Sequence, residues 1–167
     1  MWAGAKDDPW GRYVRFLLLT AVRRTEAAGM RRSEISGDLW IIPASRMKAK
    51  AEHVVPLSAA ALGLLGAANG EFVFTTDGVT PISGFSKFKR EFDRACPLPH
   101  WTLHDLRRTA RSLMSKAGVN KDIGERCLAH VIGGVSGVYD RYAYLEQKRA
   151  AFDALAAEVA RIVEERS

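Results

Sequence analysis

The stretch WTLHDLRRTARS, residues 101–112, carries the most informative pattern in this chain. Thr102 is followed three residues later by Asp105, which is the spacing of a capping box and predicts that a helix starts here. On that helix His104 and Arg107 lie three residues apart, so their side chains share one face. Both can donate hydrogen bonds to one anion, beside the partial positive charge of the helix start. The residues fit a solvated helix start with a buried histidine equally well, so the rest of the chain must decide.

The composition predicts one compact, soluble domain with a basic surface. The chain has 167 residues, 47% of them hydrophobic, which is enough for a sizeable core. The net charge of +6 favours a polyanionic partner without proving one. Cys96 and Cys127 lie far apart and no CxxC is present, which favours a reduced, cytoplasmic setting over a disulfide framework or a zinc site.

Several classes of protein are excluded by the absence of their motifs. The apolar run at residues 16–22 is too short to span a bilayer, and the charged opening residues 1–13 do not form a signal peptide. The sequence contains no P-loop, GxSxG or HExxH motif and no cluster of paired carboxylates. The common hydrolase and nucleotide triphosphatase classes are therefore excluded.

Hydrophobic periodicity predicts an α+β domain that is mostly helical and has a small antiparallel sheet. In the first half of the chain we expect a helix from Arg12 to about Met30, strands at 38–43 and 52–57 joined by the basic hairpin loop ASRMKAKA, a short helix ending at Gly70 and a short strand at 71–74. In the second half we expect helices at 84–95, from Thr102 to Ala117, from Asn120 to near His130, and a C-terminal amphipathic helix with Leu145, Phe152, Leu155, Val159 and Ile162 on one face.

Three tyrosines stand close together in GVYDRYAYLEQ, residues 137–147: Tyr139, Tyr142 and Tyr144. A tyrosine can act as a covalent nucleophile when cationic neighbours stabilise its phenolate. Arginines, lysines and histidines are all available in this chain, and the local sequence alone does not choose among the three tyrosines.

At this point the chain resembles the catalytic domain of the tyrosine recombinases, specifically the prophage-type integrases. The resemblance rests on HDLRRT at 104–109 and on CLAHVIGGVSGVYDRYAYLEQKR at 127–149. Two earlier segments agree: LLLTAVRRTEAAGM at 17–30 is similar to the first arginine box, and WIIPASRMKAKAEHVVPLS at 40–58 is similar to the lysine-bearing β-hairpin. The likeness extends from about residue 12 to residue 165, and it implies the tyrosine-recombinase catalytic-domain fold.

The resemblance also implies the site residues. Its first box places an arginine at Arg23 and an acidic residue at Glu26, which would orient a neighbouring arginine or histidine. Its hairpin lysine falls on Lys48, with Lys50 in the same loop as the competing choice. The remaining boxes supply His104, Arg107 and His130, and the nucleophile, nine residues after the last histidine, is Tyr139.

In chemical terms the resemblance implies a site-specific DNA recombinase, an enzyme that cuts and rejoins DNA strands through a 3′-phosphotyrosyl intermediate. It implies no cofactor, no metal and no small-molecule substrate. The expected partners are double-stranded DNA and further copies of the chain, which would form a synaptic tetramer on DNA. The resemblance is also compatible with a chain that is monomeric when it is not bound to DNA. The setting would be the cytoplasm of a bacterial host. The alternative is a non-enzymatic DNA-binding remnant or regulator that derives from a prophage integrase.

Two kinds of departure from the family pattern are visible. The family often has glycine where Ala21 and Ala129 stand here, and alanine is nearly as small, so we expect close packing to survive. Family members also carry N-terminal core-binding and arm-binding domains. Residues 1–167 are expected to be a single catalytic domain without them, either excised from a longer protein or left from a decayed prophage.

The glycine-rich segment VIGGVSG at 131–137 precedes Tyr139 and has high backbone freedom. We therefore expect Tyr139 to lie away from the other site residues in the absence of DNA. The arginines and histidines, which are carried by helices, should converge on one point before DNA binds.

Overall fold

A computed structural model describes residues 2, 4–67, 70–130 and 144–165, and Tyr139 and Tyr142 lie outside this described part. Its α-helices and strands, in chain order, are α1 (Pro9–Thr20), α2 (Arg24–Ala28), β1 (Ile35–Ser36), β2 (Leu39–Ile42), β3 (His53–Pro56), α3 (Ala59–Leu62), α4 (Phe85–Ala95), α5 (Leu103–Lys116), α6 (Lys121–Cys127) and α7 (Leu145–Glu164). The predicted fold class, mostly helical with a small antiparallel sheet, is confirmed.

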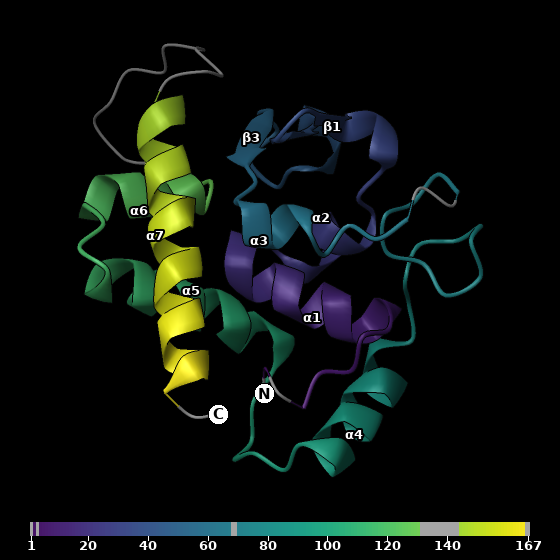
Figure 1. Ribbon diagram of the computed structural model, residues 1–167. Coiled ribbons are helices and arrows are strands. Elements are labelled where there is room, and N and C mark those ends of the chain that lie inside the picture. Colours follow the sequence, from purple (N-terminus) through teal and green to yellow (C-terminus); the bar gives the residue numbers. More distant parts are fainter. Residues whose placement is uncertain (1, 3, 68–69, 131–143, 166–167) are drawn as a thin grey trace.

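The sheet has the order β1-β2-β3, with both pairs antiparallel, and it covers one end of the helical core (Figure 1). In the central pairing Trp40 lies opposite Val55 and Ile41 opposite Val54. Trp40 and Ile42 are buried on the face that meets the helices, as expected for a strand with one face on a core. The two predicted strands are confirmed, whereas the two-residue strand β1 was not predicted.

Helix α1 lies at the centre of the domain and packs against α5, α3 and α7. It is buried on most of its surface, and its Phe16 ring lies 5.8 Å from the Trp40 ring and 5.1 Å from the Phe74 ring. The α1 helix therefore fixes the sheet, α5 and the C-terminal helix relative to one another.

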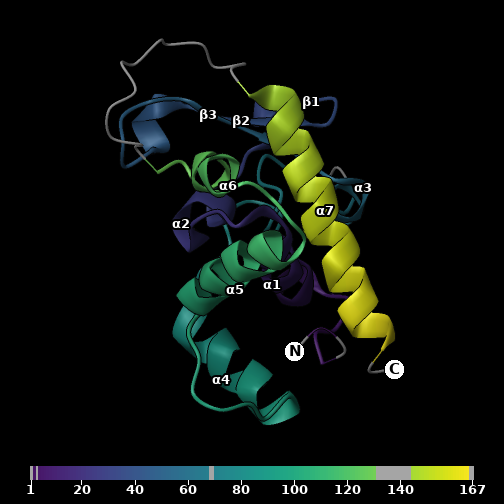
Figure 2. The same cartoon turned by 90° about the vertical axis from the view of Figure 1, so that its left-hand side faces the viewer.

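The long helix α7 runs along one side of the domain, past α6, the sheet and α5 (Figure 2). Phe152, Leu155 and Val159 are buried on its inner face, in agreement with the predicted amphipathic pattern. None of the helices in the described part of the chain combines the length and apolar character that crossing a bilayer requires.

The predicted continuous helix from Arg12 to Met30 is wrong. Helix α1 ends at Thr20, because Ala21 adopts a left-handed conformation with φ 53° and its N–H bonds to the Leu17 carbonyl at 3.0 Å. A new short helix, α2, then begins at Arg24, and Arg23 is its N-terminal capping residue. Helical periodicity continues across the break, which is why the sequence pattern concealed it.

Two smaller predictions also need correction. The helix expected to end at Gly70 ends at Leu62, where Gly63 follows as the cap and Gly66 adopts a left-handed conformation. The strand expected at 71–74 is reduced to a single bridge between Arg31 and Phe72. In contrast, the capping box of α5 is confirmed, since the Thr102 backbone N–H donates to the Asp105 carboxylate at 2.9 Å.

Ala21 and Ala129, the positions at which the family resemblance led us to expect glycine, both adopt left-handed backbone conformations, with φ 53° and φ 52°. A left-handed conformation favours glycine, so the backbone, rather than close packing alone, bears on the choice of residue at these two positions. An alanine in this region is disfavoured by roughly 1–2 kcal/mol, partly offset because glycine gains more entropy on unfolding. We expect Ala21→Gly and Ala129→Gly each to raise the free energy of unfolding by about 0.5–1 kcal/mol in urea titrations.

A matched control is Ala117→Gly, because Ala117 ends α5 with an ordinary φ of −76°. There glycine should lower the free energy of unfolding by about 0.4–1 kcal/mol. Equal destabilisation at all three positions would contradict the conformational explanation.

Candidate active site

A pocket of about 340 Å³ opens where the break after α1 faces the first turn of α5. Its lining combines three arginines and a histidine with small and apolar residues: Val22, Arg23, Arg24, Thr25, Leu103, His104 and Arg107. The N-terminus of α5 adds partial positive charge, since Leu103 and His104 are the first two residues of that helix. The cationic lining and this helix end favour a small anion such as a phosphate group.

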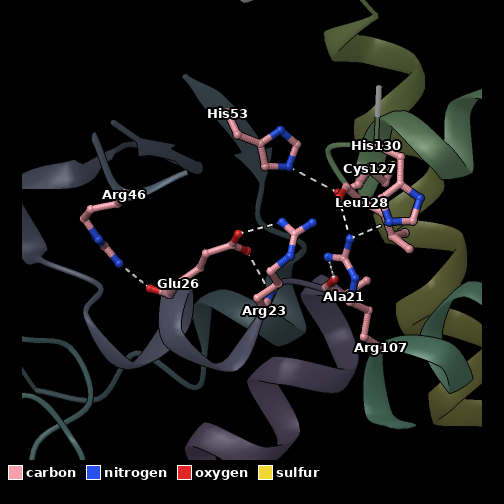
Figure 3. A network of polar contacts seen from close by, with 9 residues as sticks. All are labelled: Ala21, Arg23, Glu26, Arg46, His53, Arg107, Cys127, Leu128 and His130. Carbon is pink, nitrogen blue, oxygen red and sulfur yellow. Dashed lines mark hydrogen bonds and ion pairs between the residues drawn. The ribbon is translucent and has the colours of Figure 1, made fainter. Parts of the chain in front are cut away.

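Arg107 reaches this pocket from inside the protein, with only 4% of its surface exposed. Its guanidinium donates to the Ala21 carbonyl and to the Leu128 carbonyl, each at 2.5 Å, and contacts the His130 Nε2 at 3.0 Å (Figure 3). Burial lowers the pKa of Arg107 to about 10, so the side chain stays cationic at neutral pH. The left-handed turn at Ala21 thus supplies one of the acceptors that hold this arginine in place.

Arg23 faces the same pocket from the start of α2 and is held by Glu26. The Glu26 carboxylate accepts from the Arg23 backbone N–H and from its guanidinium, both at 2.8 Å. Glu26 itself is buried, and the carbonyl of the same residue accepts from Arg46, as Figure 3 shows. Glu26 therefore lies behind Arg23 and fixes its direction.

His130 follows α6 through a left-handed turn at Ala129 and is an exposed residue. The His130 N–H bonds to the Glu125 carbonyl and the Ala129 N–H bonds to the Arg126 carbonyl, both at 3.0 Å, which is the bonding pattern of a Schellman motif. This turn brings the His130 ring back against Arg107 and against the Glu125 carboxylate, whose Oε2 lies 2.6 Å from Nδ1.

The other predicted site residues are placed as follows. His104 is exposed in the first turn of α5 and lines the pocket with Arg23 and Arg107. Lys48 is exposed in the turn between β2 and β3, outside the pocket lining. Tyr139 lies outside the described residues. The structure therefore brings two arginines and two histidines together, with Glu26 behind them, and leaves Lys48 on the neighbouring hairpin.

The arginines adjacent to the predicted ones differ from each other. Arg24 lines the pocket, and its guanidinium also lies over the Phe85 ring at 5.2 Å. Arg108 is exposed and pairs with Asp105 at 3.1 Å, as expected for the outer face of α5.

Sequence reasoning missed His53, which lies behind the site at the start of β3. Its buried ring donates from Nε2 to the Cys127 carbonyl at 3.2 Å and so joins the sheet to α6. Burial, assisted by the positive charge of Lys148, lowers the pKa of His53 from its ordinary 6.5 to about 3. Lys148 is buried too, donates to the Val54 carbonyl, and has its pKa lowered to about 8 by burial. The only sequence feature that could have indicated a role for His53 is its position, as an ionisable residue, at the start of a strand of β-branched residues.

The neutral state of His53 predicts a specific loss of stability in acid. Between pH 6.5 and about 3 the unfolded chain binds a proton at His53 that the folded chain does not bind. The free energy of unfolding should therefore fall as the pH falls through this window, by up to about 1.4 kcal/mol per pH unit. Urea titrations of the native chain and of His53→Gln, which keeps a donor for the Cys127 carbonyl, isolate this contribution. A pH-independent difference between the two proteins would refute it.

The chain belongs to the phage integrase family, whose model matches residues 11–146. The chain is 35% identical to prophage integrase IntA of Escherichia coli strain K12 over 142 residues, and 35% identical to prophage integrase IntZ of the same strain over 145 residues. These alignments cover 79% and 82% of this chain but 34% and 36% of the relatives. The chain thus spans about a third of the length of these two integrases.

Solved structures of lambda integrase share the fold. A lambda integrase tetramer bound to a Holliday junction superimposes with a TM-score of 0.64 at 16% sequence identity, over 82% of this chain and 46% of that one. A lambda integrase(75–356) dimer bound to a COC′ core site gives a TM-score of 0.65 at 16% identity, over 81% of this chain and 56% of the lambda integrase chain. The expectation of a tyrosine-recombinase fold, made from the sequence boxes, is confirmed.

Proposed function

We propose that this chain is the catalytic domain of a site-specific DNA recombinase that cuts and rejoins DNA through a 3′-phosphotyrosyl link. The observation that carries the proposal is the convergence of Arg23, His104 and Arg107 on one pocket, with His130 bonded to Arg107. A scissile phosphate in this pocket would meet two guanidinium groups and a helix start, which suits the charge that develops on its non-bridging oxygens.

In the proposed reaction the Tyr139 oxygen attacks phosphorus and loses its proton, and the bond from phosphorus to the 5′ oxygen breaks. Lys48 protonates the departing 5′ oxygen, which leaves as a hydroxyl group. Arg23 and Arg107 stabilise the phosphorane-like charge, and His104 and His130 donate hydrogen bonds or shuttle the tyrosine proton. The reverse attack by a 5′ hydroxyl restores the phosphodiester, so rejoining needs no external energy source.

Duplex DNA is the proposed partner, and self-association on DNA is proposed with it. The net charge of +6 supports attraction to a polyanion. The proposal of assembly draws on family membership and on the assembled state of lambda integrase in the two solved complexes.

The test uses a pool of nicked duplexes with a randomised core, in which the short 5′ fragment diffuses away after cleavage. We expect the chain to form a complex that survives detergent, forms in the presence of a chelator, and can be sequenced to reveal the preferred site. Salt-sensitive binding without any covalent complex would instead support the non-enzymatic DNA-binding alternative. If the chain neither binds the duplexes nor forms a covalent complex, both the recombinase proposal and the DNA-binding alternative are overturned.

A further inference from the structure

The His130 imidazole is held between two partners of opposite character. Its Nε2 faces the Arg107 guanidinium at 3.0 Å, and its Nδ1 faces the Glu125 carboxylate at 2.6 Å. An arginine can only donate hydrogen bonds, and an ionised carboxylate can only accept them. The ring must therefore accept at Nε2 and donate at Nδ1, which assigns its neutral proton to Nδ1.

The Glu125 carboxylate is itself fixed from its other side. Its second oxygen, Oε1, accepts from the Arg111 Nε at 2.9 Å. Arg107 and Arg111 are four residues apart on α5, so both project from one face of the helix toward α6. These contacts join Arg107, His130, Glu125 and Arg111 in a continuous chain across the two helices. Its two hydrogen-bonded donors also lower the pKa of Glu125, so the carboxylate stays ionised at neutral pH.

The backbone of α6 is shaped to admit this arrangement. A Cβ atom at Gly124 would lie 3.0 Å from both the Cζ and the Nε of Arg111, closer than side chains normally pack. Glycine at this position lets the Arg111 guanidinium cross the helix surface to reach Glu125. The Schellman turn at Ala129 then returns His130 to the same side.

We propose that Glu125 is a positioning residue that fixes the tautomer and direction of His130, so that Nε2 is held against Arg107, which lines the phosphate pocket. When a phosphate in the pocket takes over the Arg107 hydrogen bond, Nε2 is free to accept the proton that the nucleophile releases, and the imidazolium then donates to a phosphate oxygen while the carboxylate offsets its charge. A carboxylate that orients a working imidazole in this way is a recurrent arrangement in catalytic sites. The functional part of this inference rests on the proposed recombinase activity, whereas the tautomer does not.

Nitrogen-15 NMR of the histidine rings at about pH 8, above the ordinary histidine titration range, reads the tautomer directly. We expect the His130 proton on Nδ1, and the His53 ring gives an internal reference with its proton on Nε2, because it donates to the Cys127 carbonyl. In Glu125→Ala the ring loses the acceptor that holds it against Arg107, so it should rotate away from the guanidinium and the His130 signals should shift toward an average of both tautomers. Glu125→Gln should keep the Nδ1 proton, because the amide oxygen still accepts. Asp122→Asn, an exposed carboxylate change on the same helix, should leave the His130 signals unchanged.

The activity arm measures covalent adduct formation on the nicked duplex pool. Glu125→Ala should slow adduct formation about 10–100-fold without weakening DNA binding, and Glu125→Gln should recover part of the loss. An Nε2 proton on His130 in the native chain, or an unchanged tautomer in Glu125→Ala, would overturn the proposal. An expected tautomer in a chain that forms no adduct would support the positioning geometry and remove the recombinase function.

Discussion

Replacing Arg107 by lysine is expected to slow formation of the covalent DNA adduct by a factor of about 10²–10³. The Arg107 guanidinium enters the pocket from the protein interior, where the Ala21 and Leu128 carbonyls hold it in place. A lysine ammonium carries the same charge but lacks the planar fork that can bond both carbonyls and still face a phosphate oxygen. The rate of adduct formation on the nicked duplex pool, measured at saturating protein, checks this expectation.

The same substitution should also lower the free energy of unfolding by about 1–3 kcal/mol, since at least one buried carbonyl loses its donor. The adduct assay must therefore be run at a temperature where circular dichroism shows the variant to be folded. Arg108→Lys is the matched control, because Arg108 is adjacent but exposed and paired with Asp105. Equal slowing in both variants would indicate an effect that does not depend on the buried position of Arg107 and would count against a specific role for this residue.

Replacing Tyr139 by phenylalanine is expected to remove the adduct completely while leaving DNA affinity unchanged. Phenylalanine has no oxygen to attack phosphorus, and the cationic pocket residues on α2 and α5 are untouched. Affinity is measured by salt-titrated binding to the same duplex pool, since phosphate contacts give a steep dependence on salt.

Tyr142→Phe and Tyr144→Phe are the controls for this substitution. The Tyr144 ring packs against Arg126 at 3.9 Å, and phenylalanine keeps an aromatic face at that position. We expect both controls to form adduct at the native rate. Loss of adduct in Tyr142→Phe with retention in Tyr139→Phe would move the nucleophile by three residues.

Much of the secondary structure followed from local rules. The capping box at Thr102 and the asparagine cap at Asn120 each depend on residues within three positions of one another. The two strands around the basic hairpin are each marked by a short run of apolar, β-branched residues. Such signals can be recognised in a sequence because the interactions that produce them are local. The family resemblance rested on a different signal, the order of the arginine and histidine boxes along the whole chain.

The contacts that build the candidate site are of another kind. Arg107 is held by the carbonyl of Ala21, 86 residues away in the chain, and His53 bonds to a carbonyl 74 residues away. Every residue has a backbone carbonyl, so the sequence does not indicate which carbonyl will accept a hydrogen bond from Arg107 or His53. The break at Ala21 was hidden for a related reason: a single left-handed residue ends α1 without any glycine to mark it. The sequence around Glu125 is typical of a surface helix. Only the turn at Ala129, which places the His130 ring 2.6 Å from its carboxylate, indicates a further role.

The central claim is that Tyr139 becomes covalently joined to a DNA 3′ phosphate. The most direct measurement is mass spectrometry of the peptide that carries DNA after the trapped complex is digested with protease and nuclease. The account predicts a nucleotide on Tyr139, with the released strand ending in a 5′ hydroxyl. A nucleotide on another residue, or a released strand that ends in a 5′ phosphate, would contradict it.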